Sequence, residues 1–321
     1  MTRDTLEHNQ IAIYFSAVVL AAVFGMLAPA VAHTFSALIT PAIGVLMYAM
    51  FLQIPFLDLR QAFDNKRFLS ALLLANFILV PLLVWVLTRG LVERPALLVG
   101  ALLVLLTPCI DYVVVFTHIG KGDSRLMLAA TPLLLLLQLM LLPVYLGLML
   151  GAQSKVVVEA RPFVEAFLLL IVAPMVLAVL TTSLARRSRV ASAWNDAWAW
   201  LPVPAMALVL FVVIASQITS VVRDFNLLLP VIPVYIGFLL LAPLMGVLAA
   251  RLFALPALTA RAVTFSAATR NSLVVLPLAL ALPEDVRGLA ATAVILQTLV
   301  ELVGELIYVR LIPKWVWPAG R

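Results

Sequence analysis

About ten runs of roughly 20 apolar residues make up most of the chain. These runs limit the possible folds more than any other feature. A run of this length matches the hydrocarbon thickness of a bilayer, where each backbone amide and carbonyl needs an internal partner, so helices are expected. The predicted spans are 10–32, 36–58, 68–89, 93–119, 124–151, 160–185, 199–221, 228–253, 257–282 and 286–312. The sequence predicts an all-α integral membrane protein with about ten transmembrane helices.

The composition agrees with a membrane protein and excludes several soluble classes. Hydrophobic residues make up 65% of the 321 positions, charged residues 11%, and the mean hydropathy is +1.17, unlike a soluble domain. The net charge of +6 comes from basic residues in short connections, so the lipid bilayer and not nucleic acid is the predicted partner. One cysteine excludes an intrachain disulfide and a Cys-rich metal site, and no HExxH, Walker A or GxGxxG motif is present. We predict no enzyme, no cofactor and no resident metal.

Basic residues are distributed unequally over the connections between the spans. The connections after even-numbered spans and the chain ends hold Arg3, Arg60, Lys66, Arg67, Lys121, Arg125, Arg186, Arg187, Arg189, Arg251, Arg261, Arg310, Lys314 and Arg321. The opposite side holds Arg89, Arg94, Lys155, Arg161, Arg223 and Arg287. Because cytoplasmic loops carry the excess of Lys and Arg, we predict a multi-pass protein of the cell (inner) membrane with both termini in the cytoplasm.

A polar segment from Thr107 to Asp123 interrupts the fourth span. Pro108 lacks an amide proton and clashes with the preceding helical turn, so the helix is expected to break there and to leave backbone groups in need of partners. Cys109, the single cysteine, and Asp111 follow directly. A helix that breaks near the middle of the membrane is typical of a binding site in a transporter.

The two halves of the chain resemble one another weakly. An ungapped alignment superimposes Cys109 on Arg270 and Asp111 on Ser272, so the polar segments of the fourth and ninth spans coincide. We therefore expect the ninth span to be broken as well.

This similarity predicts two repeats, 1–155 and 156–321. Each repeat has five spans, an odd number, so the second must be inverted relative to the first. Inverted repeats with paired broken helices direct helix dipoles at a solute near the midplane. This arrangement favours binding and translocation over catalysis.

Three short motifs resemble the arsenite exporters of the bile acid/sodium symporter superfamily. The motifs are Pro108-Cys109-Ile110 with Gly122-Asp123 in the fourth span, Met47-Tyr48-Ala49-Met50 in the second, and Ala267-Ala268-Thr269-Arg270-Asn271 in the ninth. The resemblance implies a core domain of helices 3 to 5 and 8 to 10 and a panel domain of helices 1, 2, 6 and 7. It also implies that helices 4 and 9 cross at their breaks.

The resemblance further implies secondary active transport, with arsenite or a related trivalent arsenical exported in exchange for protons. The sequence departs from the family at the coupling positions. Leu273 stands where the exporters carry a glutamate, and Ser266 and Arg270 stand where the sodium-coupled members carry a glutamate and a glutamine. A fixed guanidinium group can take the electrostatic place of a cation, which argues against sodium as the coupling ion; a proton or sodium remains the expected ion partner.

Cys109 has two interpretations. A lone membrane cysteine commonly serves as a small apolar residue that permits close helix packing. Beside a helix break it is also a candidate ligand, because trivalent arsenic is soft and prefers thiolate sulfur.

Asp111 and Arg270 are the ionisable residues predicted at membrane depth in the broken spans. Such a residue is costly unless it is paired or hydrated, so the expected role is functional, with the other residue as its partner. The alternative is a purely structural ion pair that joins helices 4 and 9.

Several neutral residues complete the predicted site. Thr107, Thr269, Asn271 and Ser272 offer hydrogen bonds to a substrate at the two breaks, or else cap the half-helices. Gln138, Gln297 and Glu301 lie in helices 5 and 10, where they either face the site or form hydrogen bonds between helices. Glu301 is a second possible proton carrier.

Three functional hypotheses remain open on the sequence alone. Cys109 favours arsenical export, whereas Arg270 favours transport of a small organic anion. An intramembrane enzyme would need a catalytic pair of aspartates or a His-Glu metal motif, and the sequence contains neither.

Overall fold

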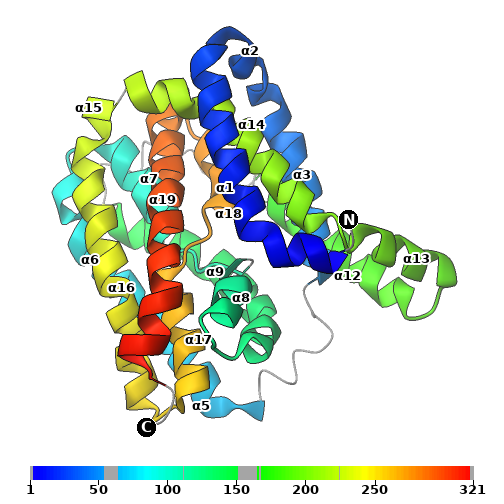
Figure 1. Cartoon of the computed structure of the whole chain (residues 1–321). Helices are drawn as coiled ribbons and strands as arrows, with labels where there is room; N and C mark the ends of the chain where they lie inside the picture. Colours follow the sequence, from blue (N-terminus) through cyan, green and yellow to red (C-terminus); the bar gives the residue numbers. More distant parts are fainter. Residues whose placement is uncertain are drawn as a thin grey trace. The chain divides into compact units, whose positions relative to one another are not determined.

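The computed structural model describes residues 3–53, 64–110, 112–150, 165, 168–223 and 225–318. Within these ranges every regular element is a helix (Figure 1), as the sequence predicts. The chain divides into two compact units, Met1–Ile54 with Ala160–Asn226 and Pro55–Glu159 with Leu227–Arg321. Each unit is described by itself.

The first unit is built on long apolar helices from both of its chain segments. Its elements are α1 (Arg3–Leu27), α2 (Pro29–Thr34), α3 (Ser36–Gln53), η4 (Leu168–Val172), α12 (Ala173–Ala185), α13 (Arg189–Trp198) and α14 (Pro202–Arg223). Helix α14 packs against α1 and α3, and α3 also packs against α12. Segments far apart in the sequence therefore share one core.

Polar and aromatic side chains attach the short helix α13 to the rest of this unit. The Tyr48 hydroxyl lies 2.9 Å from Thr181 Oγ1, and Trp194 Nε1 donates to the same hydroxyl at 3.1 Å. The Trp198 ring meets Tyr48 edge-on, with 4.9 Å between ring centroids. Tyrosine and tryptophan are typical of membrane interfaces, where an apolar ring carries a polar tip.

The second unit contains the helix breaks. Its elements are α5 (Lys66–Leu74), the π-helix η2 (Ala75–Leu79), α6 (Val80–Leu87), η3 (Thr88–Leu91), α7 (Pro95–Leu105), α8 (Tyr112–Ile119), α9 (Ser124–Met149), η5 (Leu229–Val231), α16 (Ile232–Leu252), α17 (Ala257–Ala268), α18 (Ser272–Leu280), α19 (Glu284–Leu311) and η6 (Ile312–Val316). The short α15 (Phe225–Leu228) precedes η5. Helix α19 packs against α7, α16 and α18, and α16 packs against α17.

Local sequence sets where these helices begin. Asn65 accepts a hydrogen bond from the Phe68 amide at 3.1 Å, and Asp123 accepts one from the Leu126 amide at 3.0 Å, so each side chain caps a helix N-terminus. Pro95 occupies the first turn of α7, where an amide proton would have no helical partner.

Glycine allows close backbone contacts between helices of the second unit. A Cβ atom at Gly100 would lie 2.6 Å from the Ala290 carbonyl oxygen of α19, and one at Gly246 would lie 2.6 Å from the Thr264 Cα of α17. Both glycines are on helices, α7 and α16, whose backbones approach their neighbours directly. The contact at Gly100 holds α7 against α19, and both helices lie beside the candidate site.

Six described helical segments are long and apolar enough to cross a membrane: Ser36–Gln53, Lys66–Leu91, Ser124–Met149, Pro202–Thr219, Phe225–Leu252 and Asp285–Lys314. The shorter apolar segments are Ala12–Leu27, Pro95–Leu105 and Ala173–Ala185. The multi-pass membrane class is therefore confirmed. The ten-span inverted repeat remains a prediction, and the ends of spans two and five, with the start of span six, lie outside the described residues.

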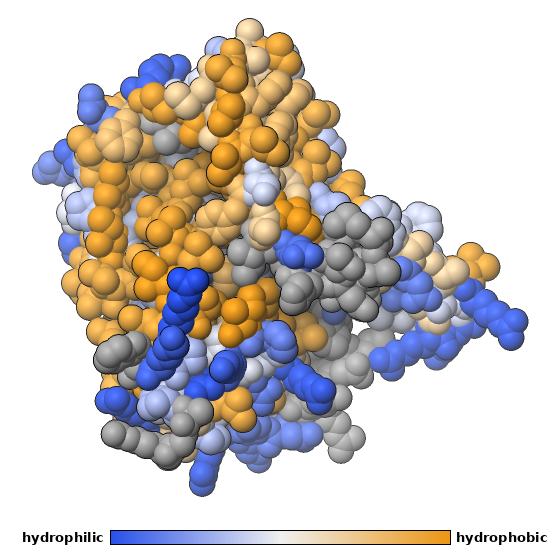
Figure 2. Space-filling view, in the orientation of Figure 1, coloured by the Kyte–Doolittle hydropathy of each residue, from blue (hydrophilic) through white to orange (hydrophobic). Residues whose placement is uncertain are grey.

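Large apolar side chains are exposed along the helices, as expected for surfaces that face lipid. In the second unit Met140, Leu148 and Leu240 expose 69%, 74% and 65% of their surface. Figure 2 shows apolar side chains over the visible face of α16, with hydrophilic side chains gathered at the end of this unit near the C-terminus. Hydrophobic residues cover the helix sides because a bilayer would surround them.

Several basic residues assigned to the connections lie inside helices, namely Lys66 and Arg67 in α5, Arg125 in α9, Arg189 in α13, Arg251 in α16 and Arg261 in α17. Arg261 is the buried one among them. Arg261 lies inside α17 and only 3% of it is exposed. Its guanidinium donates to the Trp317 carbonyl at 2.6 and 3.0 Å and to the Lys121 carbonyl at 2.7 Å. Arg261 therefore binds carbonyls within the second unit, and its assignment to a loop was wrong.

Candidate functional site

The first break separates α7 from α8 at the predicted position. Helix α7 ends at Leu105 and α8 begins at Tyr112, with Pro108 between them. The Thr107 hydroxyl bonds back to the carbonyls of Leu103 and Val104 at 3.0 and 3.1 Å. With its one proton it can donate to either of these acceptors at the end of α7, which supports a capping role for Thr107.

The second break separates α17 from α18 and consists of Thr269, Arg270 and Asn271. Thr269 has an extended backbone (φ −100°, ψ 132°) that ends α17. The Asn271 side chain caps α18 by accepting a hydrogen bond from the Val274 amide at 3.2 Å. The ninth predicted span is therefore broken where the alignment of the two halves places the break.

The two breaks meet and share backbone hydrogen bonds. Pro108 and Arg270 form an isolated antiparallel bridge. The Cys109 amide donates to the Thr269 carbonyl at 3.2 Å, and the Asn271 amide donates to the Thr107 carbonyl at 2.9 Å. Each break thus supplies partners for the groups freed in the other, which is necessary because the crossing is buried.

The guanidinium group of Arg270 is completely buried beside this crossing. Its Nη2 atom donates to the carbonyls of Ser266 and Ala267 at 2.6 and 2.9 Å and to Asn76 Oδ1 at 2.8 Å. Its Nη1 atom lies 3.5 Å from the Leu105 carbonyl. These carbonyls end α17 and α7, so the positive charge lies at the negative ends of two helix dipoles.

Asp111, the predicted partner of Arg270, lies outside the described residues, and the Asp111–Arg270 pair remains a prediction. The backbone amide of Arg270 instead donates to the Glu301 carboxyl group of α19, at 3.0 and 3.1 Å to its two oxygens. The Glu301 carboxyl also lies 2.8 Å from the Tyr112 hydroxyl and accepts a hydrogen bond from Gln297 Nε2. Glu301 and Gln297 therefore do face the break.

Glu305, one turn after Glu301, reaches the same break. Its Oε1 lies 2.8 Å from the Thr269 hydroxyl, and its side chain is completely buried. Among the described residues its Oε2 has no hydrogen-bond partner. The carboxyl group therefore touches the break with one oxygen and leaves the other unused.

Several predicted site residues keep unused polar atoms in the interior. Within the described part of the chain, hydrogen-bond partners are absent for Asn271 Nδ2, Ser272 Oγ, Gln297 Oε1, Arg270 Nε and both amide atoms of Gln138. Buried polar groups are rarely left unpaired. The atoms of Arg270, Asn271, Ser272 and Gln297 belong to the second break, α18 and α19, which makes that part of the interior a candidate place for a solute or water, whereas Gln138 lies on α9. Cys109 lies at the crossing with its whole surface buried.

Sequence reasoning missed three residues of this site: Asn76, Tyr112 and Glu305. Asn76 binds Arg270 and also donates to Ser266 Oγ at 3.0 Å. Glu305 could have been recognised from the sequence, because a carboxylate inside an apolar span is a functional candidate by default. Asn76 and Tyr112 carry no comparable indicator, since their importance comes from partners that are distant in the sequence.

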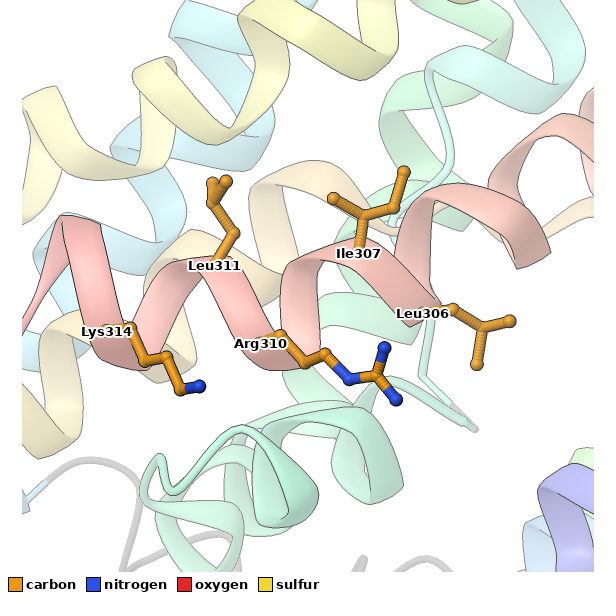
Figure 3. Close-up of a pocket in the computed structure, with 5 residues that line it drawn as sticks. All are labelled: Leu306, Ile307, Arg310, Leu311 and Lys314. Carbon is orange, nitrogen blue, oxygen red and sulfur yellow. The ribbon is translucent and has the colours of Figure 1, made fainter.

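A second polar feature lies near the end of α19. A pocket of about 360 Å³ is lined by Leu306, Ile307, Arg310, Leu311 and Lys314. Figure 3 shows Arg310 and Lys314 extending from one side of the helix, with Ile307 and Leu311 on another. The pocket therefore combines two positive charges with an apolar wall.

A buried polar crossing of two broken helices among apolar helices is an arrangement typical of membrane transporters. Among the described residues there is no group of three His, Cys, Asp or Glu residues that could hold a metal ion. The model of the sodium bile acid symporter family matches residues 40–224, more than half of the chain. The chain belongs to this family of transporters.

This match confirms the predicted superfamily and leaves the arsenite-exporter branch as a prediction. No curated protein matches the chain. The substrate and the coupling ion must therefore be argued from the residues of the site.

Proposed function

We propose that this chain is a secondary active transporter that exports arsenite or a related trivalent arsenical, with Cys109 as its ligand. The position of Cys109 is the observation that carries the proposal. The single thiol of the chain lies at the crossing of the two broken helices. At the second break, Asn271 Nδ2 and Ser272 Oγ have no hydrogen-bond partner among the described residues.

The chemistry of binding follows from the softness of the thiol. Arsenous acid is uncharged, and a thiol can replace one of its three hydroxyl groups by forming an As–S bond and releasing water from the thiol proton and that hydroxyl. One soft ligand gives reversible binding. The two remaining hydroxyls are suited to the free atoms Asn271 Nδ2 and Ser272 Oγ.

We further propose protons and not sodium as the coupling ion. The Arg270 guanidinium binds the carbonyls at the ends of α17 and α7, where a free cation would otherwise find its oxygen ligands. A permanent positive charge at this place removes the need for sodium. Buried carboxyl groups of α19 remain available to carry a proton.

The test is arsenite uptake into everted membrane vesicles by Cys109→Ser and Cys109→Ala. Both variants should reach the membrane in normal amounts and lose arsenite transport to near the level of vesicles without the protein, because neither hydroxyl nor methyl is a soft ligand. Cys109→Ala is the control for packing, since it keeps a small apolar side chain. Normal transport by Cys109→Ala would reduce Cys109 to a packing residue.

The pocket on α19 supports a second candidate, transport of an amphipathic organic anion such as those for which the family is named. Arg310 and Lys314 would bind the carboxylate, and Leu306, Ile307 and Leu311 would contact the apolar body.

A double variant distinguishes the two candidates. Arg310→Gln with Lys314→Gln should abolish transport of carboxylates and leave arsenite transport intact, because arsenous acid has no charge for these residues to bind. Arg125→Gln, which removes an exposed cation of α9, is the matched control. Uptake measured by mass spectrometry with arsenite and a panel of carboxylates decides between the substrates.

A further inference from the structure

Two buried carboxyl groups lie one turn apart on α19. Glu301 is 2% exposed and Glu305 is 0% exposed. Residues four apart share one face of a helix, and both side chains reach the α17–α18 break, Glu301 at Arg270 and Glu305 at Thr269. Two neighbouring negative charges without water are unfavourable, so such a pair tends to share a proton.

The hydrogen bonds of Thr269 indicate where this proton lies. The Thr269 hydroxyl is 2.7 Å from the Phe265 carbonyl and 2.8 Å from Glu305 Oε1. A hydroxyl has one proton, so it can donate to only one of two acceptors. If Glu305 is a carboxylic acid, it donates to the hydroxyl, the hydroxyl donates to the carbonyl, and both short contacts become hydrogen bonds.

Glu301 has a related contact but also has N–H donors. The Tyr112 hydroxyl lies 2.8 Å from both the Arg270 carbonyl and Glu301 Oε1. Glu301 additionally accepts from the Arg270 amide and from Gln297 Nε2. These donors stabilise an ionised Glu301, whereas in the described part of the chain Glu305 has no N–H donor and one oxygen without any partner.

Among the described residues, no oppositely charged side chain contacts the Glu305 carboxyl group. The elements packed against α19 are α7, α8, α16, α18 and η6. The titratable or charged side chains on these elements, and on α19 near the two carboxyl groups, are Tyr112, His118, Tyr235, Arg251, Tyr308, Arg310 and Lys314. The breaks add Cys109 and Arg270. Asp111 lies outside the described residues. Of these, His118, Arg251, Arg310 and Lys314 are exposed. The hydroxyls of Tyr235 and Tyr308 donate to carbonyls of Ala293 and Leu239.

We propose that Glu305 is a proton-binding site whose proton is exchanged during transport, with Glu301 as the neighbouring ionised acceptor. The inference rests on the proposed transport function. Thr269 connects the site to the solute path, since its hydroxyl contacts Glu305 and its carbonyl accepts from the Cys109 amide. Loss of the Glu305 proton leaves a buried charge facing Thr269, so release requires the crossing to rearrange or to admit water.

Infrared spectroscopy of the purified protein tests the proton directly, without any substrate. The carbonyl-stretch band of a buried carboxylic acid should be present at neutral pH, disappear in Glu305→Gln and remain in Glu301→Gln. Glu93→Gln, at an exposed loop carboxylate, should leave the band unchanged. A spectrum without this band, or a band lost only in Glu301→Gln, would overturn the assignment.

A second variant covers the case in which Glu305→Gln does not accumulate. Thr269→Val keeps the size of the side chain and removes the hydroxyl that accepts the Glu305 proton. The acid band should shift to higher frequency because its hydrogen bond is lost. An unshifted band would show that the acid is elsewhere.

Transport in proteoliposomes then separates coupling from function. Two rates are measured for each variant, uptake driven by a pH gradient and substrate counterflow, and their ratio is compared. In Glu305→Gln this ratio should fall to the value that the same assay gives without a gradient. In Glu93→Gln it should stay at the value of the parent protein. Counterflow by the parent without any response to the gradient would overturn the coupling role. Absence of counterflow with every substrate would instead overturn the proposed function, while the infrared result would still decide the proton site.

Discussion

The buried guanidinium group of Arg270 is the most demanding single residue of this protein. A charge at bilayer depth is costly unless other groups compensate it. Here the compensation comes from three backbone carbonyls and the Asn76 amide oxygen. The Phe238 ring adds a cation–π contact, with its centroid 5.5 Å from the guanidinium carbon. Arg270 therefore organises the ends of α7 and α17 from one position.

The first prediction at this scale concerns Arg270 and Asp111. Arg270→Gln should destabilise the protein by about 3 kcal/mol, because it leaves buried acceptors without a donor. If Asp111 is the partner, Asp111→Asn should also destabilise the protein, and the double variant should recover much of the loss. Thermal unfolding in detergent measures this coupling.

Transport by the same double variant separates two roles for the pair. Recovery of both stability and transport would indicate a structural pair alone. Recovery of stability without transport would indicate that one residue also binds the substrate or the proton. Additive losses of stability would show that the two side chains do not meet.

At the level of elements, the half-helices are held by close backbone packing as well as by polar contacts. Helix α7 ends at the crossing and lies against α19, which carries both buried carboxyl groups. Gly100 permits this contact, because any side chain there would meet the Ala290 backbone. The close approach of α7 to α19 at this point therefore depends on Gly100.

Gly100→Ala should destabilise the protein by roughly 2 kcal/mol, the usual cost of overpacking, and should lower transport by separating α7 from α19. Gly288→Ala on α19 is the matched control, since its Cβ would have no neighbour within 4 Å. It should leave stability unchanged or slightly raised, because alanine is the better helix former. Equal effects of the two changes in thermal unfolding would contradict the packing argument.

At the scale of the whole molecule, each compact unit combines one segment from each half of the sequence. The unit that contains the crossing consists of Pro55–Glu159 and Leu227–Arg321. The predicted repeats, 1–155 and 156–321, divide the chain differently, since each repeat contributes to both units. The core and panel domains, the inverted relation of the repeats and the position of the termini remain predictions.

Topology reporters test the predicted orientation. Reporters fused after Lys66 and after Arg189 should be cytoplasmic, and those near Arg94 and Lys155 should be outside, because basic residues are retained on the cytoplasmic side. Alkaline phosphatase and fluorescent protein fusions give opposite responses at each position. The reverse pattern would overturn the inverted-repeat assignment together with the orientation.

Much of this protein was predictable from local sequence. Apolar runs long enough for a bilayer indicate helices whatever their neighbours are, and Pro108 breaks its own helix because it lacks an amide proton. The weak similarity of the halves placed the second break at Arg270. These properties depend on residues close together in the sequence, so they needed no tertiary information.

Only the tertiary structure decided which groups meet at the crossing. Asn76 and Arg270 are 194 residues apart, and Tyr112 and Glu301 are 189 apart. Such contacts depend on how helices distant in sequence pack, and no periodicity or composition encodes them. The sequence by itself therefore determined a membrane protein with two broken helices, whereas packing determined that Arg270 binds carbonyls and that Glu305 faces Thr269. The physical reason is that a hydrogen bond requires its two atoms to lie about 3 Å apart. For residues distant in the sequence, only the packing of the helices decides which atoms come that close.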